Sequence, residues 1–417
     1  MKDTLFKIYK SISPSLVKKI IPIIDFSRKL KNKPPIPLRE KLAEIDYPHL
    51  IGKTILLHGV SVGEIMSLEN LIKKIKELFP SVNLVITTGT VTGQELAKKK
   101  YSSYSEFITY FPLDVYETVE TFLEKINPSV ILIAETELWP NFSYCAKEKN
   151  IPLYIINGRI SDKSYPSYLR LKSFFKFILS CYTGIFAQSE LDKNRFMELG
   201  ANIGTVEVMK NLKFEIEKKT CDIDLEPENS KVIIAGSTHK GEDSIVLDAF
   251  KKLKSDMPDL KLILAPRHLT RLDEINDLLQ NYNFRYGFRT KEETFKNCDI
   301  IVLDTLGELS KIYSIVDVAF IGGSFNNTGG HNPLEATVYS VPTISGPSIK
   351  NFRDIYSILE REKASFVVKN KDEFYSILKK LLSDNDFYNK TKENCKNCFE
   401  NQQGALEFIL NKLKSIL

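Results

Sequence analysis

The sequence predicts an α/β protein made of two doubly wound halves, and three observations support that prediction. Short β-branched runs alternate with helical patterns along the chain, which is typical of parallel sheets with helices on both faces. A length of 417 residues corresponds to two or three domains at about 150 residues each. A content of 43% hydrophobic and 27% charged residues is ordinary for a globular protein, and such a chain buries a sufficient core without disulfides or metals.

The expected strands fall into two groups, one in each half of the chain. The first group comprises residues 54–58, 84–88, 130–134, 153–156 and 185–188. The second group comprises residues 232–235, 260–265, 300–303, 318–321, 342–345 and 366–368. Polar loops and helical patterns follow these runs, as repeated strand–helix units require.

The domain boundaries follow from where this alternation stops. The polar, weakly periodic segment 215–230 is interpreted as a linker between domains 41–214 and 231–386. Residues 1–40 form a separate basic amphipathic segment, and residues 387–417 are helical with no strand left to cover. We expect this last segment to pack back on the N-terminal domain. Two doubly wound domains place a ligand cleft at the carboxyl ends of both sheets.

Charge is nearly balanced overall but is concentrated at the N-terminus. The chain has 58 Lys and Arg against 53 Asp and Glu, whereas residues 1–41 contain eleven basic and three acidic residues. The remainder is therefore slightly acidic, which argues against nucleic acid as a partner.

The basic N-terminal segment has two interpretations. Its apolar residues, from Leu5 to Ile24, are interrupted by Lys and Pro, so we expect neither a cleavable signal peptide nor a span of about 20 apolar residues. A helix of this composition can lie in a membrane interface, with its Lys side chains at anionic headgroups. The alternative is a solvated basic helix packed on the domain.

Cysteine usage and short motifs exclude several classes of site. Six irregularly placed Cys do not form a disulfide framework, so the sequence indicates a cytoplasmic protein. Cys395 and Cys398 make a lone C-x-x-C, and Asp222 and Asp224 lie in the expected linker, so no metal site is predicted. The dinucleotide motif G-x-G-x-x-G and the P-loop motif are both absent from the sequence.

The strongest functional motif spans residues 320–335, which read as a strand, a glycine loop and the start of a helix. Glycines let a backbone approach a ligand closely, and a helix N-terminus offers N–H groups to a phosphate. Glu335 could accept hydrogen bonds from ribose hydroxyls, or it could only complement the helix dipole. Arg267, after another strand, suits a phosphate, whereas the hydroxyls of residues 237–239 bind ligand or cap a helix. The second half is therefore predicted to bind a nucleotide.

Carboxylates follow the strands of the first half. Glu64 lies at the end of a strand–loop–helix unit, where it either complements the helix dipole or acts as a general base for an acceptor hydroxyl. Glu135 and Glu137 follow the third expected strand of this half, and residues 157–159 follow the fourth.

Taken together, these motifs resemble the lipid A Kdo transferases, which move 3-deoxy-D-manno-octulosonic acid (Kdo) from its CMP ester to a lipid A precursor. The matching segments occur in the family's order over nearly the whole chain. They are residues 58–64, 135–141, 157–159, 211–214, 237–239, 266–268, 307–309, 329–335 and 401–405.

The resemblance implies a GT-B glycosyltransferase, with two Rossmann-like domains whose parallel sheets face an interdomain cleft. It assigns Glu64 as the general base, and Glu135 and Lys213 as the groups that stabilise the transition state. It also assigns a set of CMP-binding residues: Pro266, Arg267, Leu306, Gly307, Glu308, Asn332, Pro333, Leu334 and Glu335.

The implied reaction is an inverting transfer of Kdo to lipid IVA in the lipopolysaccharide synthesis of a Gram-negative bacterium. It needs no metal and no cofactor, because cationic groups and backbone N–H groups receive the departing phosphate. The implied location is the cytoplasmic side of the inner membrane, as a peripheral or monotopic protein.

Two departures from the family and two alternative functions remain. The family usually has Gly shortly before its Leu-Lys-Phe motif, where this chain has residues 209–211, and its N-terminal helix is often more continuously apolar. A GT-B enzyme that uses a UDP-sugar would bind phosphate in the same way. A non-catalytic nucleotide-sensing protein would not need the carboxylates of the first half.

Overall fold

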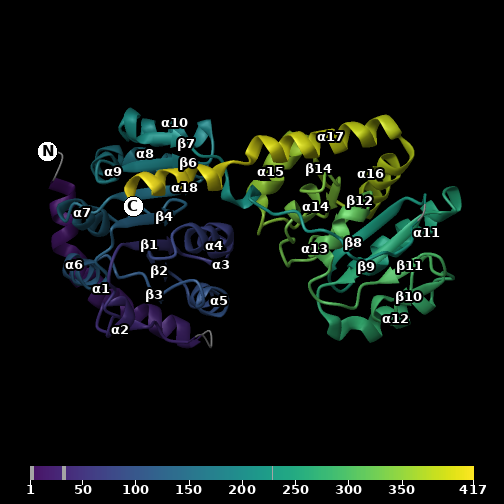
Figure 1. Cartoon of the computed structure of the whole chain (residues 1–417), viewed down its shortest axis with the longest axis horizontal. Coiled ribbons are helices and arrows are strands. Elements are labelled where there is room, and N and C mark those ends of the chain that lie inside the picture. The colour runs from purple at the N-terminus through teal and green to yellow at the C-terminus, as the bar shows by residue number, and fades with distance from the viewer. Residues whose placement is uncertain (1–3, 31–33, 228) are drawn as a thin grey trace. The chain divides into compact units, whose positions relative to one another are not determined.

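The computed structural model describes residues 4–30, 34–227 and 229–417, which form two compact units. Unit 1 comprises Met1–Glu215 together with Gln403–Leu417, and unit 2 comprises Ile216–Gln402. Figure 1 shows the purple and teal elements of unit 1 joined by the yellow C-terminal helix α18.

Unit 1 is built on a parallel sheet, with seven strands among the described residues in the order β3-β2-β1-β4-β5-β6-β7. The strands are β1 (Thr54–Gly59), β2 (Asn83–Thr88), β3 (Phe107–Tyr110), β4 (Val130–Ala134), β5 (Leu153–Gly158), β6 (Gly184–Ala187) and β7 (Val206–Val208). The direction of strand succession reverses between β1 and β4, so the carboxyl ends of these two strands are the expected place for a ligand.

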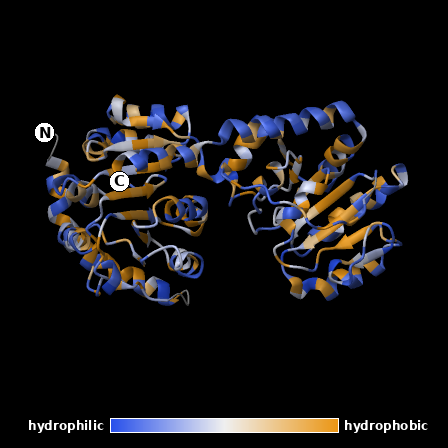
Figure 2. Cartoon of the chain, viewed as in Figure 1, coloured by the Kyte–Doolittle hydropathy of each residue, from blue (hydrophilic) through white to orange (hydrophobic). Residues whose placement is uncertain are grey.

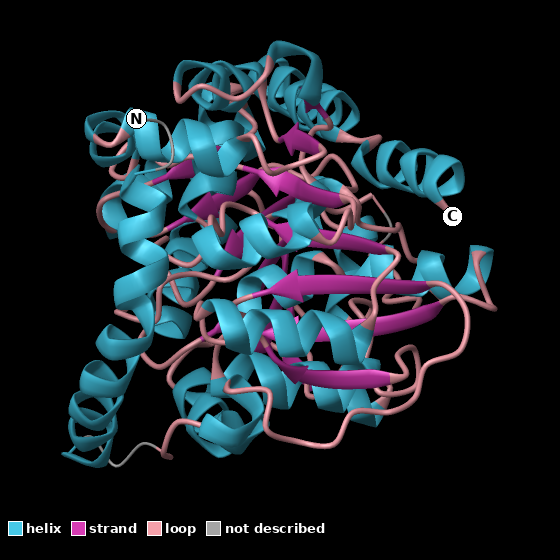
Figure 3. Ribbon diagram, turned by 90° about the vertical axis from the view of Figure 1, so that its left-hand side faces the viewer, coloured by secondary structure: helices cyan, strands magenta, loops and turns pink. Residues whose placement is uncertain are grey.

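Helices cover both faces of this sheet, as Figure 3 shows. They are α1 (Thr4–Leu30), α2 (Leu38–Lys41), α3 (Val62–Ser67), α4 (Glu69–Leu78), α5 (Val91–Tyr101), α6 (Tyr116–Ile126), α7 (Pro140–Glu148), α8 (Tyr165–Arg170), α9 (Lys172–Leu179), α10 (Glu190–Glu198) and α18 (Ala405–Ile416), with short 3₁₀ turns η1 (Ile203–Thr205) and η2 (Leu212–Phe214). Ser61, Thr90 and Ser189 begin helices by accepting a backbone N–H of the first turn. Each face has its own apolar core.

The C-terminal helix α18 completes one of these cores. Ile409 and Leu413 of α18 are buried in the same cluster as Ile55 and Leu57 of β1. Lys412 forms an ion pair with Glu207 of β7 at 2.8 Å. The C-terminal helix α18 and the first strand β1 therefore share one hydrophobic core.

Unit 2 repeats the same architecture. Its parallel sheet has seven strands within the described ranges, in the order β10-β11-β9-β8-β12-β13-β14. The strands are β8 (Val232–Thr238), β9 (Lys261–Pro266), β10 (Tyr286–Phe288), β11 (Ile300–Val302), β12 (Val318–Ile321), β13 (Thr343–Ser345) and β14 (Ser365–Val367). Strand succession reverses between β8 and β12, which sets the expected ligand position in this unit.

The helices of unit 2 are again arranged around two apolar clusters. They are α11 (Glu242–Asp256), α12 (Leu272–Gln280), α13 (Leu309–Ile312), α14 (Leu334–Thr337), α15 (Arg353–Arg361), α16 (Lys371–Ser383) and α17 (Asn385–Gln402), with 3₁₀ turns η3 (Leu269–Arg271), η4 (Arg289–Lys291) and η5 (Tyr313–Ile315).

The predicted α/β fold class is confirmed, and every expected strand is present. Figure 2 shows apolar residues concentrated along the strands, which is why their runs could be recognised. The sequence prediction missed β3, β7 and β10, each at one end of its sheet. These three strands have only three or four residues each. Edge strands are often this short, and so few residues do not make an apolar run that can be recognised in the sequence.

Two expected segment boundaries differ from the structure. Within the expected linker 215–230, Ile223 and Leu225 are buried in a core of unit 2, so that stretch is part of the unit. Within the expected segment 387–417, only the residues from Gln403 onward belong to unit 1. Helix α17 stays with unit 2, where the Cys395 thiol lies 3.1 Å from the Ala364 carbonyl oxygen.

The N-terminal helix α1 has one packed side and one exposed apolar side. Phe6 packs against Tyr144 with tilted rings whose centroids are 4.5 Å apart, and the Tyr9 hydroxyl donates a hydrogen bond to Asp114 at 2.8 Å. Six apolar side chains spaced three or four residues apart are between 39% and 67% exposed: Leu5, Ile8, Ile12, Leu16, Ile20 and Ile23. In the described part of the chain, no helix combines the length and apolar character needed to cross a membrane.

Candidate active site

Glu64 forms a variant of the capping box at the start of α3, in which its side chain accepts the N–H of Val60 rather than that of the N-cap residue Ser61. The N–H of Glu64 donates to the Ser61 hydroxyl at 3.4 Å, and that hydroxyl donates to Glu64 Oε1 at 2.9 Å. Glu64 Oε2 accepts the N–H of Val60 at 2.7 Å. An ionised carboxylate has about four lone-pair sites, so these two contacts leave acceptor capacity for a substrate proton.

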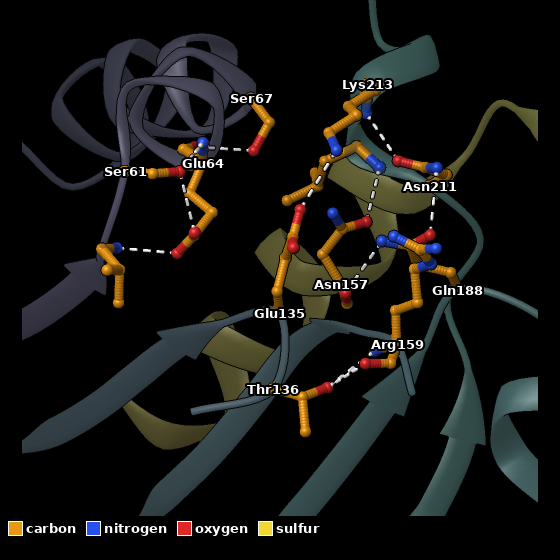
Figure 4. A network of polar contacts seen from close by, with 12 residues as sticks. Ser61, Glu64, Ser67, Glu135, Thr136, Asn157, Arg159, Gln188, Asn211 and Lys213 are labelled. Carbon is orange, nitrogen blue, oxygen red and sulfur yellow. Dashed lines mark hydrogen bonds and ion pairs between the residues drawn. The ribbon is translucent and has the colours of Figure 1, made fainter. Parts of the chain in front are cut away.

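Glu135 and Lys213 form an ion pair at the carboxyl end of the same sheet. Lys213 Nζ lies 3.1 Å from Glu135 Oε1, and each side chain is 25% exposed. Glu135 follows β4 with a φ of 58°, a left-handed conformation that a residue with a Cβ adopts at a cost. The Glu135 carboxylate points toward Lys213, as Figure 4 shows.

A chain of buried amides holds the turn η2 that carries Lys213. Asn157, at a φ of 54°, accepts the N–H of Leu212 at 3.0 Å through its side chain, and its backbone carbonyl accepts the Gln188 amide at 3.0 Å. Gln188 in turn accepts the Asn211 amide at 3.2 Å, and Asn211 Oδ1 accepts the N–H of Lys213 at 3.0 Å. These side chains link β5, β6 and η2 into the network drawn in Figure 4.

Lys210, just before this turn, adopts the conformation that a glycine would favour. Its φ is 71°, and it occupies the stretch where the resemblance led us to expect a glycine. The turn is therefore kept, at the cost of placing a side chain in the left-handed region.

Burial and neighbouring charges in unit 1 raise the pKa of two carboxyl groups, those of Glu64 and Glu137. Burial, followed by the charge of Glu135, raises the pKa of Glu64, and the hydrogen bonds from Val60 and Ser61 partly offset this rise. Burial, with the charges of Glu64 and Glu135, raises the pKa of Glu137 to about 7. A carboxylate whose pKa is raised in this way is a stronger base.

In unit 2, the glycine loop after β12 is held by an internal carboxylate. Glu242 Oε1 accepts the N–H groups of Ser324 and Phe325, both at 2.8 Å. Glu242 Oε2 accepts the N–H of Gly323 at 2.7 Å and that of His239 at 2.8 Å. The N–H groups of Gly323, Ser324 and Phe325 are therefore not available to a phosphate, because the buried Glu242, 1% exposed, already takes them. Our expectation concerned instead the N–H groups at the start of the helix that follows the loop.

The other residues expected to hold CMP lie at the carboxyl ends of β9 and β11 and around α14. Pro266 ends β9, and the side chain of Arg267 is exposed beyond it. Beyond β11, Leu306 is 79% exposed, Gly307 has a φ of 88°, and Glu308 lies 3.6 Å from Arg289. Glu308 thus already has a cationic partner within its own unit.

Two of the expected CMP-binding residues around α14 contribute to the local structure of the chain. Asn332 Oδ1 accepts the N–H of Leu334 at 3.1 Å across Pro333, and the Leu334 side chain is buried. Burial raises the pKa of Glu335, and the charges of Lys219 and Arg267 oppose that rise. Glu335 and Arg267 are therefore electrostatic neighbours.

Motif reading missed Glu242 and Gln188, and it included Asn211, His239 and His331 in matching segments without giving these three residues a role. Glu242 follows Gly241 at the start of α11, and only its distant bonds to the glycine loop reveal its role. Gln188, just after β6, and Asn211, just before η2, act through a hydrogen bond that spans 23 residues of sequence. His239 and His331 lie 92 residues apart, yet their Nε2 atoms are 2.9 Å apart.

Comparisons with known proteins concern the family and the fold of the chain. The chain matches the family model of 3-deoxy-D-manno-octulosonic-acid transferase (kdotransferase) over residues 32–216, and that of glycosyl transferases group 1 over residues 226–398. UDP-GlcNAc 2-epimerase from Neisseria meningitidis has a similar fold, with a TM-score of 0.56 and 15% identity over 87% of this chain and all of that one. At this identity the likeness concerns the fold alone.

Two relatives are closer in sequence. A bifunctional glycosyltransferase/methyltransferase of Fusobacterium nucleatum is 40% identical over 343 residues, which cover 79% of this chain but 53% of that protein. A 3-deoxy-D-manno-octulosonic acid transferase of Haemophilus influenzae is 32% identical over 372 residues, which cover 87% of each chain. The chain therefore belongs to the 3-deoxy-D-manno-octulosonic acid transferase family of glycosyltransferases.

Proposed function

We propose that this protein transfers Kdo from CMP-Kdo to a lipid A precursor, lipid IVA, in lipopolysaccharide synthesis. Family membership supports the transferred sugar and the class of reaction. The observation that carries the proposal is the grouping of Glu64 with the Glu135–Lys213 ion pair at the carboxyl end of one sheet. An enzyme that activates a hydroxyl needs such a buried, positioned base.

In this proposal Glu64 is the catalytic base. It removes the proton from the acceptor hydroxyl as that oxygen attacks the anomeric carbon of Kdo, while the bond from that carbon to the CMP phosphate breaks. A single displacement of this kind inverts the anomeric centre. The raised pKa of Glu64 suits it for taking the proton near neutral pH.

Glu135 and Lys213 stabilise the transition state as a pair. Lys213 supplies a positive charge near the developing negative charge, and Glu135 fixes the lysine's position through their 3.1 Å contact. The strained backbone at Glu135 and the amide network behind Lys213 keep both groups in place before the substrate binds.

Unit 2 binds the CMP part of the donor. Arg267 offers a guanidinium to the phosphate, and Glu335 offers acceptor oxygens to the ribose hydroxyls. Pro266, Leu306, Gly307, Glu308, Asn332, Pro333 and Leu334 complete the proposed donor site. Its loops lie at the carboxyl ends of β9, β11 and β12, where doubly wound sheets bind their ligands.

The exposed side of α1 is proposed to lie on the cytoplasmic face of the inner membrane. Its apolar residues form one line, and Lys18, Lys19 and Lys29 are exposed on the same helix. Such a helix places its apolar side among acyl chains and its lysines at anionic headgroups. A lipid acceptor would then reach unit 1 without leaving the membrane surface.

Incubation of the purified full chain with CMP-Kdo and lipid IVA, followed by mass spectrometry of the lipid, tests the function. We expect the acceptor to gain the mass of one or more Kdo residues. Lipid IVA that keeps its mass, under conditions in which the Haemophilus influenzae relative converts it, would refute the proposal.

The second candidate is a GT-B enzyme with a UDP-sugar donor, because such an enzyme would bind the donor phosphate through the same kind of groups as Arg267 and the loops after the strands of unit 2. Calorimetric titration with CMP and UDP separates the two. We expect binding of CMP and little binding of UDP, and the reverse order would favour the second candidate.

A further inference from the structure

Three of the chain's five histidines gather at the carboxyl ends of the unit 2 strands. The imidazoles of His239 and His331 are stacked, with ring centroids 5.2 Å apart and an interplanar angle of 13°. His268 meets His239 edge-on, with centroids 5.5 Å apart. His239 follows β8, His268 follows β9, and His331 comes from the glycine loop after β12.

The contact between His239 and His331 limits how many protons the pair can hold. Their Nε2 atoms lie 2.9 Å apart, within hydrogen-bond distance. One Nε2 must then donate and the other must accept, so a single proton lies between the two nitrogens. In this geometry the pair can take up one further proton, on a ring Nδ1, but not two, and it titrates as a unit.

The loop that carries His331 is shaped to keep it there. A Cβ on Gly323, whose φ is 69°, would lie 3.0 Å from Cδ2 of His331. A Cβ on Gly322 would lie 2.4 Å from the Ser237 carbonyl oxygen. Glu242 binds the N–H groups of both His239 and Gly323, so one buried carboxylate fixes both sides of the pair.

Most charged groups around the pair are cationic. Burial lowers the pKa of His331 to about 4, helped by Arg267, His239 and His268. Burial also lowers the pKa of His239, with further lowering from His268, Arg271 and Arg267 and an opposing effect from Glu242. Both oxygens of Glu242 already accept two N–H groups each. The free protein therefore keeps the pair uncharged, beside an exposed guanidinium that faces solvent.

We propose that His239 and His331 bind anionic oxygens of the sugar-nucleotide donor together with Arg267, and that the pair takes up one proton from solvent when the anion binds. This inference rests on the proposed donor site and adds a second cationic element to it. An anion beside the pair favours its charged form, which then donates Nδ1–H hydrogen bonds, because both Nε2 atoms face each other. Two anionic groups of CMP-Kdo fit this chemistry, the phosphate and the carboxylate of the sugar acid.

A pH titration of the histidine ring signals by NMR tests the inference on the full chain. The chain is labelled at imidazole carbon, and His239→Gln and His331→Gln identify the two signals. Titrations are run without ligand and with CMP, UMP, cytidine or free Kdo. His49, exposed in unit 1, and His58, buried there with its pKa lowered to about 3, serve as internal controls.

We expect CMP or Kdo to increase the proton affinity of the pair at least about tenfold, with the signal of His49 unmoved. A shift with CMP assigns the pair to the phosphate, and a shift with Kdo alone assigns it to the sugar carboxylate. Cytidine, which lacks both anionic groups, is expected to leave the pair unchanged.

The outcomes for the inference and for the proposed function differ. If UMP shifts the pair as strongly as CMP, the histidine pair stands and the preference for cytidine is wrong. If neither nucleotide nor Kdo shifts the pair, or if cytidine shifts it equally, the inference is overturned. As a second measurement, CMP affinity in His331→Gln should keep only the pH dependence that comes from ionisation of the CMP phosphate itself, whereas His49→Gln should keep the larger dependence of the native chain.

Discussion

The two units have the same parallel-sheet architecture, but the carboxyl ends of their strands carry different titratable side chains. Carboxylates predominate in unit 1, whereas histidines and Arg267 lie beside Glu308 and Glu335 in unit 2. In unit 1 these ends carry Glu64, Glu135 and Glu137, with one lysine, Lys213, paired to Glu135. In unit 2 they carry Arg267 and three histidines around a carboxylate that is already bound to backbone N–H groups. The scaffold is shared, so the side chains after the strands decide what each unit binds.

Burial and like charges shift pKa values in both units, upward for the carboxyl groups of unit 1 and downward for the histidines of unit 2. The groups affected are Glu64 and Glu137 in unit 1, and His239 and His331 in unit 2. In each unit the neutral forms are therefore favoured, those of the carboxyl groups in unit 1 and those of the imidazoles in unit 2. A proton acceptor is useful for activating a hydroxyl, and a site that becomes cationic is useful for binding an anion.

The largest expected effect comes from removing the single lysine of the acidic site. Lys213→Met should lower turnover by about 10²–10³-fold, because it deletes a positioned charge at the transition state. CMP affinity should stay the same, since the proposed CMP residues lie in unit 2. Steady-state kinetics and calorimetry measure the two quantities, with Lys193→Met on α10 as the control.

Removing a cationic side chain from unit 2 should weaken nucleotide binding. Arg267→Ala should weaken CMP binding about tenfold to a hundredfold, by loss of a charge-assisted hydrogen bond. Calorimetry with CMP measures this effect, and Arg361→Ala, 69% exposed on α15, is the matched control. Equal CMP affinity in both variants would remove Arg267 from the donor site.

The sequence predicted the elements of both units better than it predicted the environment of their charges. Buried strands such as 54–58 and 130–134 are continuous apolar runs, and the loop carboxylates follow them directly. The role of Glu242 depends on N–H groups 81 to 83 residues away, which no local pattern reveals. The capping box at Ser61 and Glu64 is visible in the sequence, but its closeness to Glu135 requires the fold.

Glu242 provides a test of stability rather than of binding. Glu242→Gln places an amide NH₂ where backbone N–H groups now donate, so the free energy of unfolding of unit 2 should fall by about 2–3 kcal/mol. Denaturant unfolding followed by circular dichroism measures the change. Glu274→Gln, 45% exposed, should leave the unfolding curve close to that of the native chain.

The smallest expected effect is on membrane binding through α1, a helix that contains none of the proposed catalytic or CMP-binding residues. Ile20→Ser combined with Ile23→Ser should reduce partitioning onto anionic vesicles several-fold, because two exposed apolar side chains are lost from the membrane side. Both are point changes that keep the contacts of Phe6 and Tyr9. Leu191→Ser, an exposed apolar residue of α10, is the control, and equal vesicle binding of both variants would place the membrane contact elsewhere.

Replacing Glu64 by Gln tests the central claim most directly, because Gln preserves the capping box but cannot take a proton. We expect turnover at saturating acceptor to fall at least about a hundredfold, with CMP affinity nearly unchanged. In the native enzyme turnover should fall as the pH drops through the raised pKa of Glu64, and Glu64→Gln should lack this acid limb. Ser61→Ala removes the cap and one hydrogen bond to Glu64 Oε1, so it should cost stability and move the acid limb to higher pH, but it should lower turnover far less than Glu64→Gln because the base is kept. If Glu64→Gln retains most of its turnover while Glu135→Gln or Glu137→Gln loses it, Glu64 is not the base.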